Sequence, residues 1–191
     1  MARGTLDGVT QTESPSLTSP RDERARIVAF TFIPAGTRVL DIGAGDMALE
    51  RFLPFGCTYL PCDAEPRDAR TQRVDLITVL GALEHVRDVP GFFSRLRKAN
   101  LPVVVTYASV DLAPDLDRAA MGWVNHLSTE QLLVSALQAG FHAHVGTRLD
   151  DTQVVLSLRP QPQPQVQERR VLVVAQGHGA GSRGGVESLD A

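Results

Sequence analysis

The sequence predicts an α/β domain with a doubly wound, mostly parallel sheet that ends in a C-terminal antiparallel hairpin. Two observations carry this prediction. Short apolar runs alternate along the chain with segments of helical character, which is typical of a parallel sheet covered by helices on both faces. The last two runs, 141–149 and 152–158, alternate apolar and polar residues around Asp150 and Asp151, which favours a hairpin. The domain is expected to span residues 21–159.

Each expected element follows from apolar spacing and from the residues that end it. Before the hairpin, we expect helices at 21–32, 47–53, 89–99 and 129–139 and strands at 38–42, 57–62, 74–80 and 102–107. Ser128 is a suitable N-cap for the last helix, with Gln131 as its capping-box partner and Gly140 at its end. Pro61 weakens an interior position for the second strand, because proline cannot donate a ladder hydrogen bond.

Both ends of the chain are expected to lie outside this domain. Residues 1–20 are polar and offer little to bury, so we expect a disordered N-terminal tail. Residues 160–169 are rich in proline and glutamine, which is typical of an extended linker. Residues 170–191 begin with an apolar run that leads into a series of glycines. This glycine-rich tail resembles the start of a second α/β domain that is cut short.

Composition excludes several classes of partner. The chain has 191 residues, of which 43% are hydrophobic, and a formal net charge of -3. It therefore has no broad basic surface for nucleic acid. No apolar run is long enough to span a membrane, and the N-terminus does not resemble a signal peptide. Two cysteines and no leader indicate a cytoplasmic protein.

The turn after the first strand carries the chemistry. Gly43 and Gly45 leave the backbone open to a ligand at the edge where open α/β sheets bind their ligands. With Ala48 they also match the G-x-G-x-x-A spacing of dinucleotide sites, and Asp63 lies near the expected acidic position. The glycines alone leave open a nicotinamide cofactor and an adenosyl cofactor.

Asp41 favours the adenosyl cofactor. Its carboxylate would lie two residues before the first glycine, inside the turn that would otherwise hold a pyrophosphate. A negative charge there repels phosphate and attracts the cationic amino group of a methionine moiety.

Three segments together resemble the class I S-adenosylmethionine-dependent methyltransferases. Residues 39–45 (Val-Leu-Asp-Ile-Gly-Ala-Gly) are similar to the first motif of that family. Residues 75–86 (Asp-Leu-Ile-Thr-Val-Leu-Gly-Ala-Leu-Glu-His-Val) are similar to the motif of its fourth strand. Residues 123–128 (Trp-Val-Asn-His-Leu-Ser), followed by a helix and by 139–141 (Ala-Gly-Phe), resemble a later helix-to-strand passage. The resemblance implies a Rossmann-like methyltransferase fold and S-adenosyl-L-methionine as cofactor.

The resemblance also implies roles for individual residues. The implied cofactor-binding residues are Asp41, Gly43, Gly45, Asp63, Gly81, Ala82, Leu83 and Glu84. The first three would hold the amino-acid part of the cofactor, and Asp63 would bind the ribose hydroxyls. Residues 81–83 would line the sulfonium and adenine, and Glu84 would stand with His85 at the mouth where the methyl group leaves. His85 and His126 are the candidate catalytic bases, and no metal site is predicted.

The chain departs from the family between the second and third predicted strands. The family normally places a helix, a strand and an acidic turn there, whereas only residues 64–73 intervene. Such a segment is too short for a full crossover. We therefore expect the sheet to lack one edge strand and the usual adenine-binding carboxylate, for which Asp68 is a possible substitute.

The resemblance implies methyl transfer to a small-molecule or saccharide acceptor. The saccharide rests only on the glycine-rich tail, which resembles the start of a nucleotide-sugar enzyme. Two alternatives stay open. One is a degenerate methyltransferase-like binding module without activity, because of the shortened middle. The other is an NAD-dependent oxidoreductase or epimerase.

Overall fold

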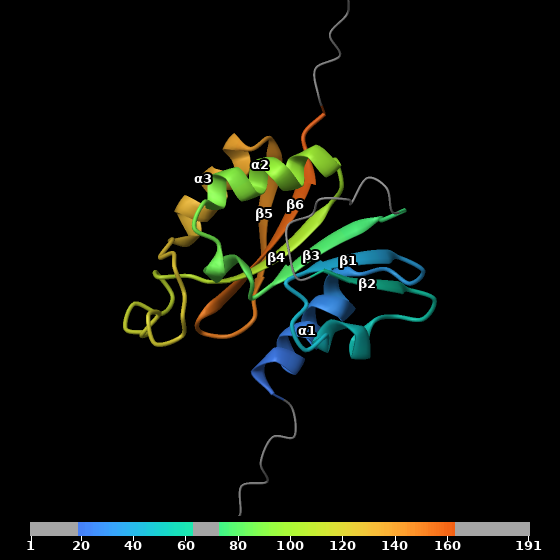
Figure 1. Ribbon diagram of the computed structural model, residues 1–191, viewed down its shortest axis with the longest axis horizontal. Helices are drawn as coiled ribbons and strands as arrows, with labels where there is room; N and C mark the ends of the chain where they lie inside the picture. The colour runs from blue at the N-terminus through green and yellow to red at the C-terminus, as the bar shows by residue number, and fades with distance from the viewer. Residues whose placement is uncertain (1–18, 63–72, 163–191) are drawn as a thin grey trace, which may run out of the picture. The chain divides into compact units, whose positions relative to one another are not determined.

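A computed structural model describes residues 19–62 and 73–162 of the chain (Figure 1). Its helices are α1 (Pro20–Phe32), η1 (Ala48–Phe52), η2 (Leu83–His85), α2 (Val89–Ala99) and α3 (Thr129–Gln138), where η marks a 3₁₀-helix. Its strands are β1 (Arg38–Ile42), β2 (Thr58–Cys62), β3 (Leu76–Leu80), β4 (Val103–Ala108), β5 (Phe141–Arg148) and β6 (Gln153–Pro160). Residues 1–18 of the predicted N-terminal tail, most of the predicted linker and the glycine-rich tail lie outside the described residues, as do Asp63 and Asp68.

The strands form one six-stranded sheet in the order β2-β1-β3-β4-β6-β5. β1 lies between β2 and β3 and runs parallel to both, and β3 runs parallel to β4. β6 is antiparallel to β4 and to β5, so the last two strands form the hairpin. The predicted doubly wound, mostly parallel sheet with a C-terminal antiparallel hairpin is therefore confirmed. Within the described residues β2 is the outermost strand on its side, which agrees with the predicted loss of one edge strand.

Each face of the sheet has its own hydrophobic cluster. α1 and η1 cover one face, and α2 and α3 cover the other (Figure 1). Leu76 and Ile77 are neighbours in β3 but enter opposite clusters, because successive side chains of a strand point to opposite faces. Burial on both faces explains why β1, β3 and β4 are mostly apolar along their length rather than alternating.

The helices confirm most of the expected boundaries. α1 begins one residue earlier than predicted, behind a capping box of Ser19 and Asp22. The predicted capping box of Ser128 and Gln131 is present at the start of α3. None of the described helices is long and apolar enough to cross a membrane.

The helix predicted at 47–53 is wrong in kind. Only the five-residue 3₁₀-helix η1 forms there, between Met47 in a left-handed conformation (φ 55°) and Leu53 in an extended one. Pro54 favours the extended conformation of Leu53. The remaining segment is too short to nucleate an α-helix.

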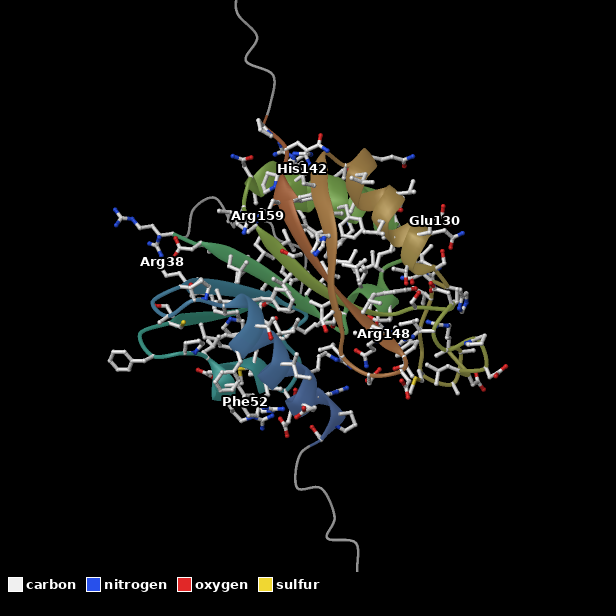
Figure 2. The ribbon with its side chains drawn as sticks, turned by 180° about the vertical axis from the view of Figure 1, so that it is seen from behind. Arg38, Phe52, Glu130, His142, Arg148 and Arg159 are labelled. Carbon is white, nitrogen blue, oxygen red and sulfur yellow. The ribbon has the colours of Figure 1, made fainter. Side chains whose placement is uncertain are left out.

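The hairpin extends beyond the predicted end of the domain at residue 159. Pro160 closes β6 opposite Phe141, and the Gln161 amide donates to the Gly140 carbonyl over 2.9 Å. Arg97 of α2 also donates from Nη2 to the Gln161 carbonyl over 2.6 Å. The first residues of the predicted linker therefore belong to the fold. The sheet is shown from behind in Figure 2.

Candidate functional site

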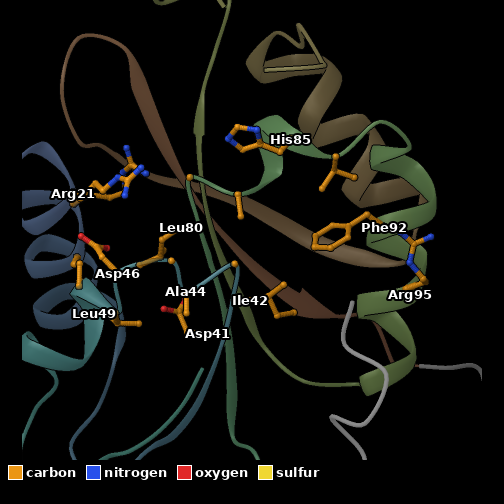
Figure 3. A pocket seen from close by; sticks show the side chains of 18 of the residues that line it. Arg21, Asp41, Ile42, Ala44, Asp46, Leu49, Leu80, His85, Phe92 and Arg95 are labelled. Atoms are coloured by element: carbon orange, nitrogen blue, oxygen red, sulfur yellow. The ribbon is translucent and has the colours of Figure 1, made fainter. Parts of the chain in front are cut away.

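A cavity of about 640 Å³ opens at the C-terminal ends of β1 and β3 (Figure 3). Its walls are α1, the turn after β1, and the segment from the end of β3 into α2. The predicted cofactor residues Asp41, Gly43, Gly45, Gly81 and Ala82 all line it. Ligands of open α/β sheets bind at this edge, so the position agrees with the sequence analysis.

Two glycines let the walls of this cavity approach each other. Gly43 has φ +73°, and a Cβ there would overlap the Ala82 Cβ. Gly81 has φ +71°, and a Cβ there would overlap the Arg24 guanidinium. Both positions therefore favour glycine for backbone conformation. Gly43 also lets the turn after β1 approach the Ala82 methyl group, and Gly81 leaves room for the Arg24 guanidinium.

Asp41 is a buried carboxylate on the floor of the cavity. It is 3% exposed, and its two oxygens accept hydrogen bonds of 2.8 Å from the Tyr59 and Thr78 hydroxyls. Burial raises the pKa of Asp41, and the two hydroxyls oppose that shift. Such a carboxylate is stabilised by a cation that enters the cavity.

Arg24 lies over Gly81 and was missed by the sequence analysis. Its Nε is buried and has no hydrogen-bond partner among the described residues. Burial lowers the pKa of the Arg24 guanidinium, and the charges of Glu84 and Asp150 partly oppose this. A half-buried cation and the buried carboxylate of Asp41 therefore line the same cavity.

The sequence held one signal for this arginine. Arg21 and Arg24 occupy the first turns of α1 and both line the cavity. Cations are unfavourable near a helix N-terminus, because the helix dipole is positive there. Arg21, in the first turn, therefore indicates a function other than helix stability, and Arg24 lies three residues on, near the same face of the helix.

The opposite end of the cavity is more apolar. Ile42, Val86 and the buried ring of Phe92 line it. Figure 3 shows Phe92 and Arg95 on the side of the cavity opposite Arg21 and Asp46. Arg95 stacks over the Phe92 ring with its Cζ 5.9 Å from the centroid. One end of the cavity thus carries Arg21 and Asp46, and the other combines the apolar surface of Phe92 with the charge of Arg95.

The resemblance implies that Leu83 lines the sulfonium and adenine and that Glu84 stands at the mouth where the methyl group leaves, but neither side chain lies on the cavity. Both side chains are buried. The Glu84 Oε1 accepts a hydrogen bond of 2.9 Å from the Ala108 amide, and Oε2 has no partner among the described residues. Burial raises the pKa of Glu84. This carboxylate joins η2 to the end of β4 instead of facing a ligand.

The two candidate bases are placed differently. His85 lines the cavity, whereas His126 is exposed and does not. The His85 Nδ1 lies 3.2 Å from the Gly122 carbonyl oxygen. A carbonyl only accepts, so Nδ1 must donate in this contact, and the neutral ring then carries its lone pair on Nε2. His85 is therefore the histidine that can act on a ligand in the cavity.

Asn125 fixes the long loop after β4 against η2. Its Nδ2 donates to the Leu83 and Val86 carbonyls over 2.7 and 2.9 Å. Its Oδ1 accepts a hydrogen bond of 2.5 Å from the Tyr107 hydroxyl, which in turn accepts from the Leu127 amide over 2.9 Å. Because η2 contains His85, this network also determines where that imidazole lies.

Solved structures of methyltransferases have the same fold. A chain of the complex between the Haloferax volcanii Trm112 methyltransferase activator and a candidate methyltransferase matches with a TM-score of 0.60 at 10% identity, over 75% of this chain and 91% of that one. A SAM-dependent methyltransferase of Thermotoga maritima matches with a TM-score of 0.54 at 13% identity, over 73% of this chain and 89% of that one. Human N-acetylserotonin methyltransferase in complex with SAM matches with a TM-score of 0.54 at 11% identity, over 74% of this chain and 52% of that one.

Comparison with protein-family models and with curated sequences gives no further evidence for the fold. No protein-family model matches the chain, and no curated protein matches it significantly. The strand order, the cavity at the ends of β1 and β3, and these neighbours agree with the resemblance of residues 39–45 and 75–86. The chain has the fold of the class I S-adenosylmethionine-dependent methyltransferases.

Proposed function

We propose that the chain binds S-adenosylmethionine in this cavity and transfers its methyl group to a small-molecule acceptor. One observation carries the proposal: a buried carboxylate, Asp41, and a half-buried guanidinium, Arg24, line the same cavity beside the glycine turns. The amino-acid part of the cofactor carries an ammonium and a carboxylate. Asp41 suits the ammonium and Arg24 suits the carboxylate, because each pair forms a charge-assisted contact.

The rest of the cavity suits the rest of the cofactor. Val86 and Phe92 offer apolar surface for adenine at the end away from Arg24. The volume of about 640 Å³ falls within the usual range of small-molecule sites. Contact of Asp63 with the ribose stays a prediction, because that residue lies outside the described part of the chain.

The protein has limited chemistry to perform in such a reaction. When bound, the cofactor supplies a methyl group that its sulfonium already activates, so the protein contributes alignment and removal of water. His85 would take the proton that a hydroxyl or amine acceptor loses, through its Nε2. Asn125 is a positioning residue for His85, because it holds η2 and the loop together.

The alternative of a dinucleotide cofactor is disfavoured by two features. The turn that would bind a pyrophosphate is lined by the carboxylates of Asp41 and Asp46. It leads into the five-residue η1 rather than into a long helix whose amides and dipole could hold phosphate.

The test is calorimetric titration of the purified full chain with S-adenosylhomocysteine and, separately, with NAD. We expect micromolar binding of S-adenosylhomocysteine and none of NAD. Arg24→Gln should weaken that binding by roughly tenfold through loss of a charge-assisted contact. Arg26→Gln is the matched control: the same helix and the same substitution, at an exposed residue that does not line the cavity. Binding of NAD alone would favour the oxidoreductase, and binding of neither ligand would leave a methyltransferase fold without activity.

A further inference from the structure

The geometry points to an acceptor that is a small anion, with its carboxylate or phosphate bound by Arg21 and its hydroxyl or amine methylated beside His85. This inference rests on the proposed function and adds the class of acceptor. It depends on the charges that line the cavity, on the position of Arg21 in α1, and on the position of His85 across the cavity.

Bound cofactor adds positive charge to the cavity. Among the described residues that line it, four are arginines, Arg21, Arg24, Arg87 and Arg95, and three are aspartates, Asp41, Asp46 and Asp88. S-adenosylmethionine brings one carboxylate together with an ammonium and a sulfonium, so its net charge is positive. Bound cofactor therefore increases the excess of positive charge. An anionic second ligand removes that excess, whereas a cationic one adds to it.

The acidic residues of α1 are engaged away from the cavity. Asp22 pairs with Arg51 of η1, and Glu23 pairs with Arg26 within the helix. Arg21 forms no ion pair among the described residues and is exposed. Its charge lowers the pKa of Arg24, so the two guanidinia are close enough to repel each other. Arg24 serves the cofactor carboxylate over Gly81, and Arg21 is left for another anion.

Arg21 and His85 approach the cavity from different walls. Arg21 comes from the first turn of α1, and His85 comes from η2. Figure 3 shows Arg21 at the left of the cavity and His85 at its upper centre, with Leu80 lower in the view than both. A small molecule between them would present its anionic group to Arg21 and a hydroxyl or amine to the His85 Nε2. A guanidinium binds carboxylate and phosphate through paired N–H donors, which favours these two groups.

The reaction at this site balances without another reactant. The acceptor oxygen or nitrogen forms a bond to the methyl carbon while the carbon–sulfur bond breaks and sulfur keeps its electron pair. The acceptor proton passes to the His85 Nε2 and then to water. The products are the methylated acid, S-adenosylhomocysteine and one proton.

The experiment compares each anionic probe with a neutral analogue that lacks the anionic group, on the chain saturated with S-adenosylhomocysteine. Calorimetry measures binding of 4-hydroxybenzoate against 4-hydroxybenzyl alcohol, and of glycerol 3-phosphate against glycerol. We expect at least one anion to bind, at least roughly tenfold more tightly than its neutral partner. Arg21→Gln should remove most of this preference, whereas Arg26→Gln should retain it.

The outcomes separate this inference from the proposed function. Normal binding of S-adenosylhomocysteine with no anion bound, or with no preference for the charged probe, would overturn the anionic acceptor and leave the cofactor site intact. Loss of S-adenosylhomocysteine binding in Arg21→Gln would make Arg21 a cofactor residue and would also overturn the inference. Failure of the unaltered chain to bind S-adenosylhomocysteine would refute the proposed function itself.

Discussion

The Thr78 hydroxyl donates a hydrogen bond of 2.8 Å to the Asp41 carboxylate, and the two residues face each other across the parallel strands β3 and β1. With Tyr59, this contact holds the carboxylate in one orientation before any ligand enters. A charge that is already oriented costs no further ordering when a cation binds. The sheet therefore maintains a buried charge at the place where the proposed cofactor carries its ammonium.

Asp41→Asn should make the fold more stable and the cofactor site weaker. Burial raises the pKa of Asp41 above its unfolded value of 3.8, so the native state keeps its proton over a range in which the unfolded state has lost it. Stability then falls as the pH rises from that value through the folded pKa. Asparagine has no carboxyl group to ionise, so Asp41→Asn removes this loss of stability. We expect a higher free energy of unfolding in urea at pH 7, with S-adenosylhomocysteine bound roughly tenfold more weakly.

Asp75→Asn should show the opposite sign and is the matched control. Hydrogen bonds from Arg38 lower the pKa of Asp75 to about 2. Its contribution to stability is present above pH 3.8 and is lost as the pH falls towards 2. Removing this exposed carboxylate should therefore lower stability at neutral pH and leave ligand binding unchanged. If both variants shifted in the same direction, burial would not be the cause of the Asp41 effect.

Gly81→Ala should weaken cofactor binding, whereas Gly36→Ala should not. Both glycines have positive φ, +71° and +78°, so each substitution costs about 1 kcal/mol of backbone strain. A Cβ at Gly36 meets open space, whereas one at Gly81 displaces the Arg24 guanidinium. Urea unfolding should therefore show that Gly81→Ala and Gly36→Ala lose similar amounts of stability. Calorimetry should show weaker binding of S-adenosylhomocysteine for Gly81→Ala alone; equal affinity in both variants would remove Arg24 from the site.

Glu84→Gln should be tolerated and Glu84→Ala should not. The side chain is buried, and its Oε1 accepts from the Ala108 amide. Glutamine keeps this acceptor and removes a buried charge. Alanine leaves the amide unpaired and opens a space, at a cost of about 2–3 kcal/mol in unfolding free energy. Thermal and urea unfolding of the two variants test this role. Equal stability of Glu84→Gln and Glu84→Ala would show that the fold does not need a side chain that joins η2 to β4.

Asn125→Ala should destabilise the fold by about 2–3 kcal/mol, because it leaves two carbonyls and the Tyr107 hydroxyl without their partner. Tyr107→Phe should cost less, about 1–2 kcal/mol, since Asn125 keeps its other contacts. In a double-mutant cycle measured by urea unfolding, the combined cost should be smaller than the sum of the two single costs. Additive costs would show that the two side chains do not act together.

Local patterns in the sequence predicted the strands, the glycine turn and the helix cap at Ser128. Buried parallel strands are apolar along their length, and capping and turn residues act on neighbours a few positions away, so such features can be recognised without knowing the fold. The same local information identified Asp41 and Gly43, and the family resemblance implied Gly81; the structure places all three on one cavity. Local information failed at η1, because Met47 is left-handed and Leu53 is extended, which leaves a segment too short for an α-helix.

The sequence by itself thus determined the sheet and the turns at its ligand-binding edge. Only the tertiary structure decided which side chains reach that edge: Arg21 and Arg24 line the cavity, whereas Glu84 turns into the core and His126 stays outside. The physical reason is distance along the chain. Arg24 meets Gly81 across 57 positions and Glu84 meets Ala108 across 24, and such contacts depend on how helices pack against strands rather than on any local pattern.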